Sequence, residues 1–181
     1  MRVLAIPGSL RATSSNAALL RAASSVAPPG TEVALYDGLG ALPHFSPDLD
    51  VEPIPPPVAA LRAQVGAADA LAISSPEYAH GMPGSLKNAL DWLVSALEPI
   101  GKPVLLISAS PGGAAHAHGQ LLEVLRTMSM QVIDGGAHVF SRGKLDADGR
   151  ITTPELLAAV TTGFAQLAEL CGQGGGAVGP A

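Results

Sequence analysis

The fold is decided by the stretch RVLAIPGSLRATSSNAALL, residues 2–20. It opens with the apolar run VLAI, the kind of short, continuous run that forms a strand buried on both faces. It closes with the start of a helical pattern, and the polar segment GSLRATSSN, residues 8–16, lies between the two. A strand that leads through such a segment into a helix indicates the first β–α unit of a parallel sheet.

The same alternation recurs along the chain. Apolar runs EVALY, ALAIS and PVLLIS begin near residues 32, 70 and 103, and helical patterns occupy residues 16–26, 57–67, 84–97 and 114–128. The segments QVI and HVF, around residues 131–140, predict a fifth strand interrupted by Gly135 and Gly136. The pattern TTPE, residues 152–155, predicts the start of a last helix that runs to about Cys171. We therefore predict an α/β fold with a parallel sheet covered on both faces.

Length and composition fit one domain. The chain has 181 residues, of which 48% are hydrophobic and 14% charged, enough apolar material for a substantial core. The ending GQGGGAVGPA has little to bury. We expect a domain over residues 1–171 and a flexible Gly-rich tail over residues 172–181.

Charge and cysteine content exclude several classes of protein. A net charge of -5 with no basic run argues against nucleic-acid binding. The single cysteine, Cys171, cannot form an internal disulfide, which favours a cytoplasmic protein. The first apolar run stops after about four residues, too short for a signal peptide. No run of about 18 apolar residues predicts a membrane span.

Three polar loops follow predicted strands, at the sheet edge where open parallel sheets bind ligands. They are PGSLRATSSN at 7–16, SPEYAHGMPG at 75–84 and SASPGGAAHAHG at 108–119. In the first, serine hydroxyls, free backbone N–H groups and the charge of Arg11 predict an anion cradle. The alternative is that Thr13, Ser14 or Ser15 only caps a helix.

The other two loops suit a planar ring. The second offers a rigid Pro76, the aromatic face of Tyr78 and glycines that permit close approach. The third, SPGG at 110–113, precedes a helix and could present N–H groups to the ring. The alternatives are a buried tyrosine in an ordinary loop and a simple helix entry.

The segments GSLRATSSN, PEYAHGMPGSLKNALDW and SASPGG resemble, in order and spacing, the NADPH-dependent FMN reductase family, whose relatives include quinone, chromate and azo-dye reductases. LPHFSPDLD, residues 42–50, is similar to that family's second loop, and the likeness extends to about residue 171. The resemblance implies a flavodoxin-like, doubly wound sheet of five parallel strands in the order 2-1-3-4-5. It also implies noncovalently bound FMN.

The resemblance assigns the cofactor site residue by residue. It implies that the FMN phosphate is surrounded by Ser9, Leu10, Arg11, Ser14, Ser15 and Asn16. It implies that the ring is bordered on one edge by Pro76, Glu77, Tyr78, Ala79 and His80, and on the other by Ser110, Gly112 and Gly113. Family members commonly carry Asn where this chain has Ala79, so the hydrogen bonds of that side chain are missing.

By the same resemblance we expect an NAD(P)H-dependent oxidoreductase. NADPH or NADH would give hydride to FMN, and a quinone, free flavin or similar acceptor would then take the same place, in a ping-pong cycle. Backbone N–H groups near Gly112 and Gly113 would stabilise the charge of reduced FMN, so no catalytic side chain is expected. Family members are usually dimers or tetramers, which predicts a homodimer or homotetramer. The alternatives are a flavodoxin-type electron carrier and a non-catalytic flavin-binding module.

Five further residues carry narrower predictions, and no metal site is predicted. His116 and His118, two apart on a helix, point about 200° apart and cannot share an ion, so we expect both to be solvated. Trp92 and Leu93 suit either the core or an oligomer interface. Cys171 has no neighbour in sequence that would lower its pKa, so it is expected to be inert.

Overall fold

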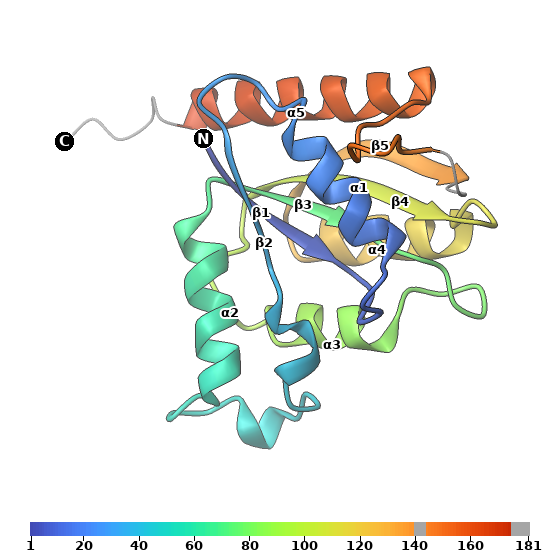
Figure 1. Cartoon of the computed structure of the whole chain (residues 1–181). Helices are drawn as coiled ribbons and strands as arrows, with labels where there is room; N and C mark the ends of the chain where they lie inside the picture. The colour runs from blue at the N-terminus through green and yellow to red at the C-terminus, as the bar shows by residue number, and fades with distance from the viewer. Residues whose placement is uncertain (140–143, 175–181) are drawn as a thin grey trace.

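Figure 1 shows the computed structural model, which describes residues 1–139 and 144–174. Its five strands form one parallel sheet in the order β2-β1-β3-β4-β5, which confirms the predicted topology. The strands are β1 (Arg2–Pro7), β2 (Glu32–Leu35), β3 (Ala70–Ser74), β4 (Pro103–Ser110) and β5 (Gln131–Val139).

Five α-helices cover the two faces of the sheet (Figure 1). They are α1 (Ser15–Ser24), α2 (Pro56–Ala67), α3 (Gly84–Asp91), α4 (Ala115–Thr127) and α5 (Pro154–Gly174). Two 3-10 turns, η1 (Gly38–Ala41) and η2 (Pro47–Leu49), lie in the long β2–α2 connection. Helices α1 and α5 pack on one face, and α2, α3 and α4 on the other. No helix in the described parts of the chain is long and apolar enough to cross a membrane.

The central strands are buried on both faces because their side chains alternate between two cores. Leu71 and Ile73 of β3 point to the core under α2, α3 and α4, whereas Ala70 and Ala72 point to the core under α1 and α5. On the second face a Cβ added at Gly163 of α5 would lie 2.4 Å from Leu105 Cδ1. The last helix therefore packs directly on β4.

Strand β5 is continuous, so the predicted interruption at Gly135 and Gly136 is wrong. The strand runs through both glycines, and its pairing with β4 shifts register between Leu106 and Ser108. Gly136 has a φ of +85°, and a Cβ on Gly135 would lie 3.0 Å from Leu106 O. The two glycines thus permit a bulge inside a strand rather than ending it.

His118 is buried, which corrects the prediction that it is solvated. It is 6% exposed, and its Nε2 lies 2.8 Å from Asp134 Oδ1 on β5. The cause is the orientation of α4, whose inward face includes Ala117, His118 and Leu121. His116, by contrast, is exposed as expected.

Helix α3 ends at Asp91, six residues before the predicted boundary at 97. The Arg62 guanidinium donates to Trp92 O through Nε at 3.1 Å and Nη2 at 2.7 Å. That carbonyl would otherwise accept the Ala96 N–H of a continuing helix, and Ala96 N instead donates to Leu93 O. The α-helical pattern is already lost before this point, because the N–H groups of Leu93 and Val94 donate to Leu90 O and Asp91 O. Arg62 thus binds a carbonyl just beyond the end of α3.

The apolar residues that follow the end of α3 differ sharply in burial. Trp92 and Leu93 are buried, with 0% and 1% of their surface exposed, so both belong to the core. Val94 and Leu97, which follow them, are 64% and 79% exposed.

Helix α5 reaches Gly174, three residues past the predicted boundary at Cys171. Cys171 packs against the α1–α5 core, and its Sγ lies 3.6 Å from Asp69 O. This anchor extends the ordered helix into the expected tail, of which residues 175–181 lie outside the described residues. Burial raises the pKa of the Cys171 thiol, in keeping with an inert side chain.

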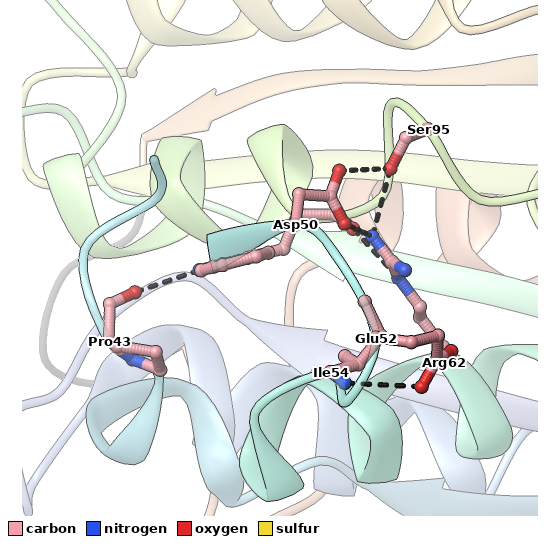
Figure 2. Close-up of polar contacts among 7 residues, drawn as sticks. Pro43, Asp50, Glu52, Ile54, Arg62 and Ser95 are labelled. Atoms are coloured by element: carbon pink, nitrogen blue, oxygen red, sulfur yellow. Dashed lines mark hydrogen bonds and ion pairs between the residues drawn. The ribbon is translucent and has the colours of Figure 1, made fainter. Parts of the chain in front are cut away.

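A polar cluster holds the β2–α2 connection against the segment after α3 (Figure 2). Arg62 Nη2 lies 2.8 Å from Asp50 Oδ1, and the Ser95 hydroxyl donates to Asp50 Oδ2 at 2.5 Å. Further along, Trp92 Nε1 donates to Pro43 O at 2.8 Å, and Asn88 Oδ1 accepts from the Phe45 N–H at 2.8 Å. The long connection is therefore fastened near both ends of the LPHFSPDLD segment.

This cluster predicts how stability depends on acid pH. The hydrogen bond from Ser95, together with Arg62, lowers the pKa of Asp50. Below about pH 4 the unfolded chain takes up the proton first, so the free energy of unfolding falls as pH drops toward the folded-state pKa. Ser95→Ala should flatten this acid limb in urea unfolding series between pH 7 and pH 2. Asp148→Asn, at an exposed pair, should leave the limb unchanged; an equal effect of both variants would contradict the assignment.

Candidate functional site

The three predicted loops meet at the carboxyl ends of β1, β3 and β4. The Gly8 N–H donates to Ser74 O at 2.8 Å, and the Ala109 N–H donates to Ser75 O at 3.1 Å. Ser9 Oγ lies 3.3 Å from the Tyr78 hydroxyl, so the first and second loops touch. A Cβ on Gly8 would lie 2.8 Å from Leu86 Cδ2, and this close approach explains a glycine at the turn.

The β1–α1 loop caps α1 and also leaves polar groups exposed. Ser14 caps α1, since its Oγ accepts the Ala17 N–H at 3.2 Å. Ser15 and Arg11 are exposed, and within the described residues the Arg11 guanidinium makes no hydrogen bond or ion pair. The first turn of α1 contains no acidic residue. A free cation beside a helix N-terminus suits a phosphate group.

Two expected phosphate ligands differ sharply in exposure. Leu10 is 61% exposed. Asn16 is only 3% exposed, and its Oδ1 accepts a hydrogen bond from the buried Ser74 hydroxyl at 2.7 Å. Asn16 therefore ties α1 to the end of β3 through its carbonyl oxygen.

The β3–α3 loop contains a two-residue hairpin turn. Tyr78 and Gly81 exchange backbone hydrogen bonds of 2.9 and 3.0 Å, with Ala79 and His80 at the corners. These corner residues have φ of +49° and +59°, the left-handed conformation of a type I′ turn. Tyr78 is 54% exposed, which contradicts the alternative of a buried tyrosine.

The left-handed Ala79 predicts a stabilising substitution. Alanine is strained there by about 1 kcal/mol, whereas Asn tolerates this conformation. Ala79→Asn should therefore raise the free energy of unfolding by about 0.5 to 1 kcal/mol in urea titrations. Ala59→Asn, at an exposed alanine inside α2, should lower it by about 0.5 kcal/mol because Asn is a poorer helix former. Changes of the same sign at both positions would contradict the strain argument.

Glu77 was expected to border a ring, and in the structure its carboxylate accepts hydrogen bonds from the start of α4. Its Oε2 accepts the N–H groups of His116 at 2.7 Å and Ala117 at 3.0 Å. The hydrogen bonds from Ala117 and His116 hold the pKa of Glu77 below its usual value. Because Ala114, the residue before α4, makes no side-chain cap, Glu77 caps this helix from the neighbouring loop.

The β4–α4 loop is a tight turn. The Gly113 N–H donates to Ser110 O at 3.0 Å, and Gly113 has a φ of +95°. That N–H is thus used inside the turn rather than directed at a ligand. A Cβ on Gly112 would meet nothing within 4 Å, so the exposed Gly112 borders open space.

Two residues that help to build the site, Gln120 and Ser74, were not predicted. Gln120 of α4 accepts the Met82 N–H at 3.2 Å and donates to His80 O at 3.4 Å, which fastens the hairpin to the helix. Ser74 orients Asn16, and its polar side chain at the end of an apolar strand was a usable signal. Gln120 gave no such signal, because it stands among other polar residues of a helix.

The chain resembles known proteins in both sequence and structure. Residues 1–144 match the model of the NADPH-dependent FMN reductase family. The chain belongs to this family. This chain is 36% identical over 157 residues to an NAD(P)H-dependent FMN reductase of Pseudomonas aeruginosa, covering 83% of this chain and 84% of the relative. It is also 36% identical over 140 residues to a quinone reductase of Escherichia coli, covering 74% of each.

Solved structures agree with the assignment of the reductase. FerB, a flavoenzyme NAD(P)H:(acceptor) oxidoreductase from Paracoccus denitrificans, superposes with a TM-score of 0.84 at 27% identity, covering 95% of this chain and 97% of FerB. The family resemblance and the flavodoxin-like fold are confirmed. The reductase is accordingly an FMN-dependent oxidoreductase with NAD(P)H as co-substrate and a small-molecule acceptor.

Proposed function

We propose that the reductase binds FMN across the ends of β1, β3 and β4, with the phosphate at α1 and the ring between the β3–α3 and β4–α4 loops. The observation that carries this proposal is the exposed Arg11 guanidinium beside the N-terminus of α1, which has no partner among residues 1–139 and 144–174 and precedes a helical turn without acidic residues. A phosphate would gain a charge-assisted hydrogen bond there and the helix dipole. The donors present in the β1–α1 loop therefore fit this group.

The ring would lie against residues that the structure leaves accessible. Tyr78 and Gly112 are exposed on the two loops, and Ser9 holds the Tyr78 hydroxyl from the β1–α1 loop. When bound, FMN supplies hydride transfer between NAD(P)H and an acceptor. The chain's own part is to position the ring and to offer backbone donors at the β4–α4 turn, where Gly112 remains once Gly113 is engaged with Ser110.

We propose a quinone as the acceptor, in a ping-pong cycle, supported by the quinone reductases among the relatives. Excess FMN should colour the purified protein yellow and lose fluorescence on binding. Sustained oxidation of NADPH on adding a quinone would support the proposal, and double-reciprocal plots should give parallel lines. Bound FMN that is reduced only slowly would indicate an electron carrier instead, and unchanged FMN fluorescence would refute the proposed site. Rates with NADPH and NADH across quinones, free flavins, azo dyes and metal oxyanions would rank the substrates.

We also propose that the reductase is a homo-oligomer in the cytoplasm. Exposed apolar side chains gather on the β2–α2 connection and after α3, which the Asp50–Ser95 hydrogen bond brings together. They include Leu49, Val51, Val94, Leu97 and Ile100, between 46% and 79% exposed. Apolar surface of this kind marks interfaces. Light scattering after gel filtration should give a dimer or tetramer mass, reduced by Leu97→Lys; a monomeric wild-type protein would refute the proposal.

A further inference from the structure

Three metal-ligating side chains meet where the β3–α3 loop touches the start of α4. They are Glu77, His80 and His116, and one ligand atom from each lies within 4.8 Å of the other two. The His80 and His116 rings stack with centroids 4.3 Å apart and planes 17° from parallel. Both imidazoles are exposed, and Glu77 is half-buried beneath them.

The surrounding hydrogen bonds hold the two elements together. Glu77 Oε2 is fixed by the N–H groups of His116 and Ala117, and within the described residues no hydrogen bond uses Oε1. Gln120 binds the backbone of the hairpin that carries His80. The carboxylate and both imidazoles are thus presented from a loop and a helix that are already joined, which lowers the cost of bringing them to one ion.

We propose that Glu77, His80 and His116 bind a divalent transition-metal ion of the Zn²⁺ class. Two imidazoles and one carboxylate are a donor set that such ions prefer. Zinc–ligand distances of about 2.0 to 2.2 Å place the donor atoms of a tetrahedral site about 3.3 Å apart. The present spacing of at most 4.8 Å exceeds this by no more than about 1.5 Å. Rotation of the exposed imidazoles would close that difference. The fourth position remains open to water.

The site goes beyond the proposed reductase function, because metal binding requires no FMN. A bound ion would connect the β3–α3 loop to α4 through side chains, in addition to the Gln120 contacts. The sequence did not reveal this site, because the only histidines close together in the sequence, His116 and His118, point to different sides of one helix. The structure instead pairs His116 with His80 and turns His118 toward Asp134.

Calorimetric titration of the protein with ZnCl₂ tests the proposal, with any histidine tag removed because the tag would itself bind metal. We expect one Zn²⁺ per chain. His116→Ala removes a direct ligand, which should weaken binding at least about tenfold. His44→Ala removes an exposed imidazole on the β2–α2 connection and should leave Zn²⁺ affinity unchanged. No binding by the wild-type protein, or equal affinity in wild type and His116→Ala, would overturn the proposal.

A second measurement counts the ligands. With one equivalent of Cu²⁺ as the probe, electron paramagnetic resonance of the wild-type protein should show coupling to two imidazole nitrogens. His116→Ala should show coupling to one. An identical nitrogen pattern in the two proteins would place the ion elsewhere and overturn the assignment.

Parallel FMN titrations separate this proposal from the FMN site. Arg11→Ala should lose FMN affinity and keep Zn²⁺ binding, whereas His116→Ala should lose Zn²⁺ binding and keep FMN binding. Failure of the metal site alone would leave FMN quenching intact, and failure of the FMN site alone would leave the calorimetric Zn²⁺ signal intact.

Discussion

Arg62→Met should lower the free energy of unfolding by about 3 to 5 kcal/mol, measured by urea denaturation at pH 7. The Arg62 and Asp50 side chains are only 16% and 11% exposed, so the substitution leaves a carboxylate largely shielded from water without its cation. It also removes the donors to Trp92 O, just beyond α3, and the hydrogen bond to Ser95. Loss of three partners at one side chain makes this the largest expected stability effect.

Two controls test the cause of that loss. Arg150→Met breaks the exposed pair with Asp148, whose side chains are 72% and 68% exposed, and should cost no more than about 1 kcal/mol. Adding Asp50→Leu to Arg62→Met removes the uncompensated charge and should recover part of the stability. If the double variant were as unstable as the sum of the single variants, the ion pair would not be the cause.

Arg11→Ala should weaken FMN binding by about 10- to 100-fold, as expected for one hydrogen bond to a charged group. Fluorescence quenching titrations measure this effect. The guanidinium makes no hydrogen bond or ion pair within the described residues, so the FMN-free protein should unfold at the wild-type urea concentration. The substitution thus separates ligand affinity from stability.

Arg21→Ala is the matched control for Arg11→Ala. Arg21 is exposed in the last turn of the same helix, at the end opposite the proposed phosphate. Its removal lowers net charge equally and should leave FMN affinity within about twofold, because exposed charges separated by more than about 10 Å are screened at ordinary salt. Equal losses in both variants would point to overall charge, and would count against the β1–α1 loop as the phosphate site.

The sequence predicted the strands well, because each central strand is a short apolar run with its own turn signals. It also located the three loops, since parallel topology brings the ends of β1, β3 and β4 to one edge. The family motifs added the strand order. These features depend on local pattern and topology, which a sequence displays directly.

Features made by contacts between distant residues were not predictable. Helix α3 ends at Asp91 without a local helix breaker, and Arg62 of α2 binds the backbone just beyond that end. The capping of α4 by Glu77 was not anticipated, because it joins a loop to a helix about 40 residues further along the chain. That Glu77 borders the ring stays a prediction. The burial of His118 likewise follows from how α4 packs on β5. For His118, a tertiary contact overrode a local pattern.

The β2–α2 connection has two anchored ends and an exposed middle. At one end, Trp92 and Asn88 form hydrogen bonds with the backbone of Pro43 and Phe45. At the other end, Arg62 and Ser95 form hydrogen bonds with Asp50. Between these anchored ends, Pro47, Asp48 and Leu49 are exposed. Substitutions within this short span should therefore leave both anchored ends and the folded domain intact.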